Sequence, residues 1–278
     1  MRKLIVGVLL IFALALGIAL GTGPLGDKID EERHGPRAGA SAGAAGSDPL
    51  DSALASSVAP GVLAGKLTGQ SVAIVALPGA SAATVKALAA DVTASGGAVA
   101  STTTVTTALT EASEKQMVDS LGTQLLAQIP NVVDATLTTY PRIGAMLGTA
   151  LTTTAAAAPA SASALTLRDT FSTAKLVAGP IEGNVATLTL VVAGSRIDTP
   201  ILTGILSGLR STSHGLVLTG PTASGDVAAV REAALSVGTF DGVETDAGRI
   251  GSVLLLARQV TSPGGSFGAS GSDGALPL

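Results

Sequence analysis

The Gly-x-Ser-x-Gly string is the pattern in this chain that could most directly do covalent chemistry. It occurs at Gly39–Gly43, around Ser41, and at Gly264–Gly268, around Ser266. In hydrolases such a serine is a nucleophile because it sits on a strained turn between a strand and a helix. Neither string follows a predicted strand, and both lie in segments rich in Gly and Ser. Chance composition explains both, so we predict a non-enzymatic protein without catalytic residues.

Two glycine-containing turns could approach an anion. Pro78–Ser81 follows a predicted strand but lacks the glycine spacing that brings a pyrophosphate against the backbone. Gly220–Asp226 opens a predicted helix, where free N–H groups could bind an anion. An ordinary helix start is the simpler explanation of this second turn. We therefore predict no cofactor-binding residues.

Candidate metal ligands are few, and the chain has no Cys. The soft candidates beyond the initiator Met are His34, His214, Met117 and Met146. Cu(I) favours thiolate and thioether ligands, but these residues are scattered along the chain and define no site. The sequence therefore leaves the metal ligands unknown.

A second possibility is a hard cation held by acidic residues. Asp241, Glu244 and Asp246 cluster before the last predicted helix. Carboxylates at this position also cap a helix and complement its dipole, which explains the cluster more simply.

An α/β fold must position these residues. Hydrophobic residues make up 46% of the 278 and aromatic residues only 2%, so Ala, Val, Leu and Ile must fill the core. Short apolar runs predict strands buried on both faces, and apolar residues at helical spacing predict helices between them. The predicted strands are 71–77, 98–105, 187–193, 215–219 and 237–243. The predicted helices are 82–95, 111–129 with a capping box at Ser113 and Gln116, 142–151, 167–178, one that begins at Pro200 and is capped by Thr199, 226–235, and one capped by Asp246. This alternation predicts about five mostly parallel strands with helices on both faces.

The N-terminus is typical of a membrane segment. Arg2 and Lys3 precede an apolar run, Leu4 to Leu20, that reaches the length of a membrane span when extended to Leu25. Positive charge on the N-terminal side places the rest of the chain outside the cytoplasm. A cleaved signal peptide is the alternative, because Ala19 to Gly21 offers small residues at the right spacing.

The chain therefore divides into four predicted parts. Residues 1–25 form a single transmembrane anchor or uncleaved signal, and 26–60 form a flexible linker, with one short helix possible near 48–66. Residues 61–262 form an extracytoplasmic α/β domain, and 263–278 form a loose tail rich in Gly and Ser. The net charge is -4 without any run of Lys or Arg, so a nucleic-acid partner is not expected.

Several stretches of this sequence resemble the actinobacterial copper-transport (outer-membrane copper channel) protein family. They are Gly17 to Gly21, Leu67 to Val105, Asp246 to Val260 and the tail segments GGSFG and GALP. The family's usual plan has a membrane helix, a coiled coil and an α/β domain. Here Gly26 to Pro49 carries no heptads where the coiled coil should lie, and no ligand residue can be carried over.

The resemblance implies a single-pass envelope protein with a role in copper transport or homeostasis, with copper as the handled ion. A lone span cannot conduct ions, so transport would need a homo-oligomer or an envelope partner protein. Residues 4–25 would contact membrane lipid, in the inner membrane on physical grounds or the outer membrane by family naming. The alternative is a non-catalytic scaffold for envelope or cell-wall machinery.

Overall fold

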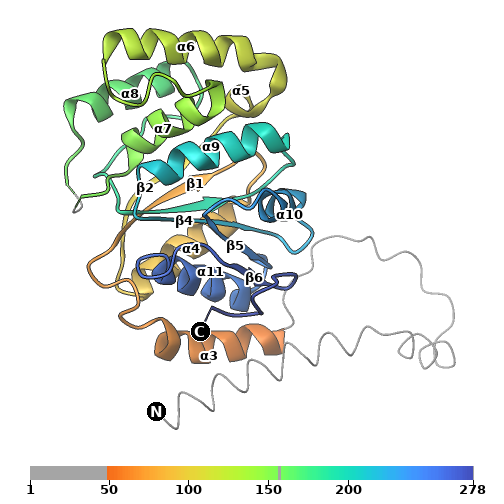
Figure 1. Ribbon diagram of the computed structural model, residues 1–278. Helices are drawn as coiled ribbons and strands as arrows, with labels where there is room; N and C mark the ends of the chain where they lie inside the picture. Colours follow the sequence, from red (N-terminus) through yellow and green to blue (C-terminus); the bar gives the residue numbers. More distant parts are fainter. Residues whose placement is uncertain (1–48, 156–157, 278) are drawn as a thin grey trace, which may run out of the picture.

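The computed structural model describes residues 49–155 and 158–277. In these residues six strands form one sheet in the order β2-β1-β3-β4-β5-β6, and each neighbouring pair is parallel. Helices cover both faces of the sheet (Figure 1). The α/β prediction is confirmed, with a sixth strand beyond the five expected. The strands are β1 (Ser71–Ala76), β2 (Ala98–Thr104), β3 (Leu188–Val192), β4 (Gly215–Gly220), β5 (Gly238–Asp241) and β6 (Ser266–Gly268).

The central strands are buried along their whole length. Each residue of β1, β3 and β4 is buried, as expected for apolar runs in a parallel sheet covered on both faces. The chain runs from β1 outward to β2 and then returns to β3 on the other side of β1. The strand order therefore reverses between β1 and β3, and this is where doubly wound sheets bind ligands, at the carboxyl ends of the strands.

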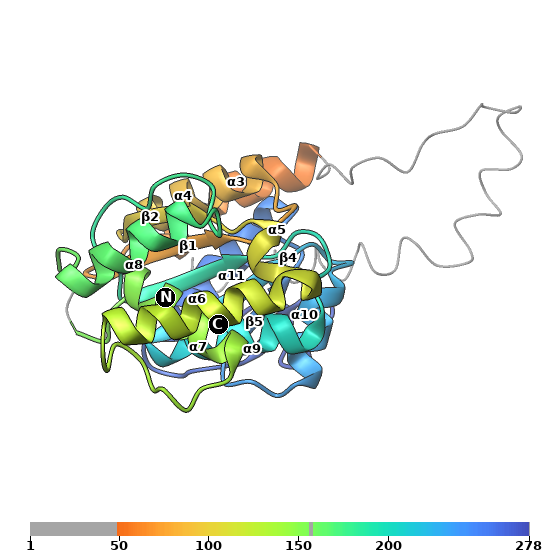
Figure 2. The same ribbon diagram turned by 90° about the horizontal axis from the view of Figure 1, so that it is seen from above.

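Two helical layers enclose two cores. One core lies between the sheet and α3, α4 and α11, and the other lies on the opposite face under α5 to α10. On that second face α9 lies on the sheet, α7 packs on α9, and α6 and α8 flank α7 (Figures 1 and 2). The helices are α3 (Pro49–Leu63), α4 (Ala82–Ala94), α5 (Thr107–Thr110), η1 (Ala112–Glu114), α6 (Lys115–Gln128), α7 (Thr139–Leu151), α8 (Ala162–Thr173), α9 (Thr199–Ser211), α10 (Gly225–Glu232) and α11 (Asp246–Arg258).

Helices α7 and α9 meet through glycines at i, i+4 spacing on each helix. A Cβ added at Gly144 would lie 2.4 Å from the carbonyl oxygen of Ile205, and one at Gly208 would lie 2.3 Å from the backbone nitrogen of Ala145. A Cβ at Gly204 would lie 2.7 Å from the Cβ of Tyr140. The two helices are thus packed backbone against backbone, at a separation that no larger residue allows.

Three helix starts differ from the predictions. The predicted helix 111–129 is divided into η1 and α6, and α6 begins after Glu114 without a side-chain cap, so the Ser113–Gln116 capping box is wrong. Thr245, not Asp246, caps α11 by accepting a bond from the Gly248 N–H at 3.0 Å. For α9 the capping position is Asp198, and Thr199 is already helical.

The boundary between linker and domain also needs correction. Residues 49–60, assigned to the linker, belong to α3, which packs against α11 and buries Ala55, Val62 and Leu63. The predicted anchor at 1–25 and most of the linker lie outside the described residues. Of the helices that the structure describes, none is long and apolar enough to cross a membrane.

The predicted loose tail is wrong, because it supplies β6, which forms one edge of the sheet. The buried Asp241 carboxylate accepts bonds from the Ser270 hydroxyl at 2.6 Å and from the Arg231 guanidinium at 2.8 Å. Arg231 also donates to the Phe267 carbonyl at 2.7 Å, which ties β5, β6 and α10 together. A row of Gly and Ser suggested a flexible segment, but the partner of this tail is a carboxylate distant in sequence.

We predict that Gly208→Ala lowers the free energy of unfolding by about 1–3 kcal/mol, because the added methyl overlaps backbone atoms of α7. Urea unfolding followed by circular dichroism measures this. Gly61→Ala is the matched control, since a Cβ there meets nothing within 4 Å. Its stability should be unchanged or higher by up to about 1 kcal/mol. Equal effects of the two substitutions would contradict the close α7–α9 contact.

We predict that Asp241 contributes to the acid sensitivity of the fold. Burial alone would raise the pKa of Asp241, but the bonds from Ser270 and Arg231 outweigh it and hold the pKa below its ordinary value of 3.8. The ionised carboxylate therefore stabilises the fold above pH 3.8, and this contribution is lost as the pH falls through the lower folded-state pKa. The difference in unfolding free energy between the native chain and Asp241→Asn should shrink in that range. A difference in unfolding free energy that does not change with pH would contradict a stabilising role of the ionised Asp241 carboxylate.

Candidate functional site

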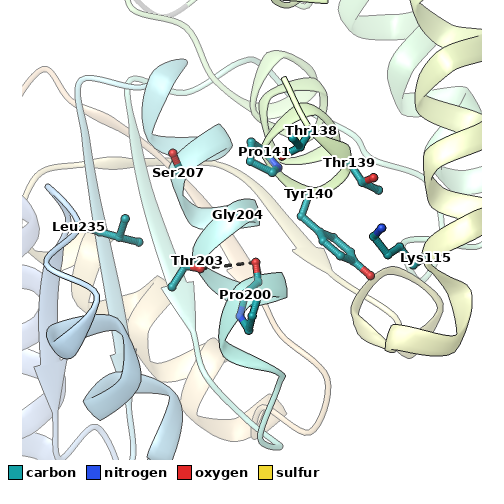
Figure 3. Close-up of a pocket in the computed structure, with 10 residues that line it drawn as sticks. All are labelled: Lys115, Thr138, Thr139, Tyr140, Pro141, Pro200, Thr203, Gly204, Ser207 and Leu235. Carbon is teal, nitrogen blue, oxygen red and sulfur yellow. Dashed lines mark hydrogen bonds between the residues drawn. The ribbon is translucent and has the colours of Figure 1, made fainter. Parts of the chain in front are cut away.

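A cleft opens where the first turns of α7 and α9 face the start of α6. It consists of two adjoining hollows of about 450 and 410 Å³ that share Lys115, Tyr140 and Pro200. Figure 3 shows the larger hollow. The Tyr140 side chain extends from α7 toward Lys115, and Pro200 of α9 lies across the hollow from it. The lining residues of the larger hollow are Lys115, Thr138, Thr139, Tyr140, Pro141, Pro200, Thr203, Gly204, Ser207 and Leu235.

The strand order explains why the cleft lies here. The second hollow is lined by Arg196 and Asp198, from the loop that follows β3, and by the first residues of α9. This loop leaves the carboxyl end of the sheet beside the point where the strand order reverses. Ligand sites of open α/β sheets gather at this point. The position of the cleft is therefore set by the topology of the fold.

The crevice directly between β1 and β3 is closed. The Ser195 N–H donates to the Pro78 carbonyl at 2.7 Å, and a Cβ at Gly194 would lie 2.1 Å from the Ala80 nitrogen. The loops after the two strands thus touch through their backbones, and the Pro78–Ser81 turn cannot hold a phosphate. The opening is displaced to the neighbouring start of α9.

Tyr140 is the unusual residue of the cleft. It is 7% exposed, and its hydroxyl is buried without a hydrogen-bond partner among the described residues. Burial raises the pKa of the phenol above its ordinary value of 10.0, and the negative charge of Asp198 raises it further. Tyr140 therefore stays protonated at neutral pH and offers a buried donor.

The loop that carries Arg196 and Asp198 rests on a buried carboxylate. Asp226 is 2% exposed and accepts a bond from the Ile197 N–H at 3.0 Å. Burial raises the pKa of Asp226, while this bond and the charge of Arg196 act in the opposite direction. A buried carboxylate that accepts a backbone N–H fixes the loop, so Asp226 positions one wall of the cleft.

The second candidate anion turn has its donors occupied. Glu244 accepts from the Thr222 N–H at 3.1 Å, and the Ser224 hydroxyl caps α10 by accepting from the Val227 N–H at 3.4 Å. The segment 220–226 is therefore an ordinary helix start and not an anion-binding turn.

The structure does not bring the soft metal-ligand candidates together. His214 is exposed before β4, Met146 is buried in the core, and Met117 is 37% exposed on α6. His34 lies outside the described residues. In the part of the chain that the structure describes, no group of three or more His, Cys, Asp or Glu could hold a metal ion.

The acidic cluster is engaged elsewhere. Asp241 pairs with Arg231, Asp246 pairs with Arg249, and Glu244 accepts from Thr222. Of the two candidate serines, Ser266 lies in β6 and donates its N–H to Asp273, whereas Ser41 lies outside the described residues.

Sequence reasoning missed the cleft. Lys115, Tyr140, Arg196 and Asp198 are separated by up to 83 positions in the numbering and match no motif. One signal was available, because Tyr140 is the single tyrosine in a chain with no Trp. A second was the pair of charged residues, Arg196 and Asp198, directly after a buried strand, where open α/β sheets place their binding residues.

This fold and cleft define a class, the doubly wound parallel α/β domain with an opening at the carboxyl ends of its strands. The chain belongs to the family described as "Copper transport outer membrane protein, MctB", whose family model matches residues 2–278. The resemblance noted in the sequence is thereby confirmed. This description is not that of an enzyme class. A comparison with curated proteins gives no match.

We predict that the phenol of Tyr140 titrates at higher pH than free tyrosine, because burial and Asp198 both disfavour the phenolate. With a single tyrosine and no Trp, phenolate absorbance reports this residue alone. Asp198→Asn should move the titration back toward lower pH by removing one negative charge, whereas Glu182→Gln, outside the cleft, should not. A native titration at or below the value for free tyrosine would show that the ring is not buried as described.

Proposed function

We propose that this chain is a non-enzymatic component of the cell envelope that takes part in copper transport or copper homeostasis. The match of the family model to residues 2–278 carries the proposal, since the family is described as a copper transport outer membrane protein. Copper ions are the cargo in this proposal.

The proposed attachment to the envelope is one membrane helix at residues 4–25, with the folded domain outside the cytoplasm. The apolar run after Arg2 and Lys3 supports this topology. Copper could not pass through one such helix, because its backbone groups bond to one another and its side chains face lipid. Several copies of the chain, or an envelope partner protein, would have to form the path. The family description favours the outer membrane.

In this proposal the folded domain acts by recognition, and the cleft beside Tyr140 is its recognition site. The cleft supports this role because it combines charged, hydroxyl and apolar side chains on three different helices. A second candidate function, a scaffold for envelope or cell-wall machinery, is favoured by the same cleft, since a partner protein could also dock there.

We predict that deleting the gene changes cell-associated copper and copper tolerance. The full chain should restore both, and a chain lacking residues 2–25 should restore neither, because the domain would no longer be held at the membrane. Copper content by mass spectrometry and growth over a copper series measure these effects. Zinc content serves as the control, because a general envelope defect would alter both metals.

Unchanged copper content and tolerance in the deletion strain would contradict the copper role. Crosslinking in intact membranes then tests the scaffold, which requires a partner that the native chain captures and a Tyr140→Ala chain loses. Full rescue by the chain without residues 2–25 would instead contradict the anchored topology.

A further inference from the structure

The cleft is rich in hydrogen-bond donors. Tyr140 contributes a buried phenol, and Lys115 and Arg196 contribute cationic groups that only donate. Asp198 is the one carboxylate among the residues that line the two hollows. The lining therefore carries two positive charges and one negative charge, so its net charge is positive.

Helix α9 adds to this polarity. Asp198, Thr199, Pro200 and Ile201, which line the smaller hollow, are the capping residue and first turn of this helix of 13 residues. Asp198 makes no side-chain bond to the helix start. The positive end of the helix dipole therefore faces the same space as Arg196 and Lys115.

The unpartnered phenol is the observation that points to a ligand. A buried donor without an acceptor is costly, and the hydroxyl of Tyr140 has no partner among the described residues. Burial, and after it the charge of Asp198, raises the pKa of the phenol, and Asp198 makes no bond with it. A ligand that brings an acceptor to this hydroxyl would satisfy it.

We propose that the cleft binds an oxyanion, a phosphate or carboxylate group, between Tyr140, Lys115 and Arg196. Figure 3 shows the Lys115 side chain beside the Tyr140 ring, and the hydroxyl itself is covered. Lys115 is exposed and pairs with the bound charge, and the phenol donates to the oxyanion when the groups that cover its hydroxyl move aside. Charge-assisted bonds of this kind are the strongest that side chains form with phosphate.

The rest of the lining defines what the oxyanion is attached to. Pro141, Pro200 and Leu235 give the larger hollow an apolar side. A free phosphate would leave this side unused, whereas the headgroup and first carbons of a phospholipid would cover it. Both sources share the same anion chemistry, and the binding experiment separates them.

The test uses the full chain in detergent with inorganic phosphate as the probe. Broadening of the phosphorus-31 resonance follows binding without depending on the tyrosine, and chloride at equal ionic strength is the blank. The native chain should bind phosphate saturably, and Lys115→Met and Arg196→Met should each weaken binding about tenfold, as expected for the loss of one charge-assisted bond. Tyr140→Phe should weaken it less.

Two controls keep the result specific. Lys115→Arg should bind phosphate like the native chain, and it retains the charge if Lys115→Met misfolds. Lys86→Met removes an exposed lysine from α4, on the opposite face of the sheet, and should have no effect. Absence of phosphate binding, or equal weakening by Lys86→Met and Lys115→Met, would overturn the proposal.

Dihexanoyl phosphatidic acid, used as a monomer, then distinguishes the two sources. Displacement of phosphate at about tenfold lower concentration supports a lipid headgroup, because burial of a few CH₂ groups suffices for this gain. Displacement at equal concentration supports a free oxyanion. Neither outcome depends on copper, so this proposal and the proposed function can fail separately.

Discussion

The separation between α7 and α9 determines the geometry of the cleft. Where the two helices touch, each presents glycines, and a Cβ at Gly148 would lie 2.1 Å from the Thr212 hydroxyl. The same contact reaches the cleft, since the backbone of Gly204 packs against the Cβ of Tyr140. Tyr140 is thus fixed at its base by a backbone and not by a side chain that could change rotamer. Because the α7–α9 contact is rigid, the Tyr140 side chain keeps its position although its hydroxyl has no partner among the described residues.

The loop that follows β3 forms the other wall of the cleft, and contacts with neighbouring loops fix its path. The loops after β1 and β3 bond to each other at the point where the strand order reverses, which fills the usual crevice with backbone. The loop after β3 must then turn outward over Asp226, and the carboxylate that accepts the Ile197 N–H holds it there. Arg196 and Asp198 consequently line the smaller hollow together with Lys115 of α6. Because the backbone fills the crevice between β1 and β3, where the strand order reverses, the cleft lies beside this point, at the start of α9.

Much of this fold could be predicted from the sequence because its strands are continuous apolar runs bounded by Gly, Pro and Ser. The β1–α4–β2 unit was predicted correctly, since each signal there is local; in the structure Ser81 caps α4 by accepting from the Thr84 N–H. The tail was predicted to be loose, and residues 49–60 of α3 were assigned to the linker, because their partners, Asp241 and α11, are distant in sequence; the short helix considered near 48–66 is α3. The cleft could not be predicted for the same reason. No periodicity relates Lys115 to Arg196, and only the packing of three helices brings them together.

The first described helix, α3, begins at the end of the domain that carries the cleft. Figures 1 and 2 both show that α3 begins at the end of the domain where the carboxyl ends of the strands lie. If residues 4–25 form the anchor that the sequence predicts, residues 26–48 can extend at most roughly 80 Å from it. Such an anchor would be joined to the domain at the end that carries the cleft, which would keep this end within about 80 Å of the membrane surface. A donor-rich cleft facing phosphate headgroups would meet anions at high local concentration, which relaxes the affinity that the site itself must supply.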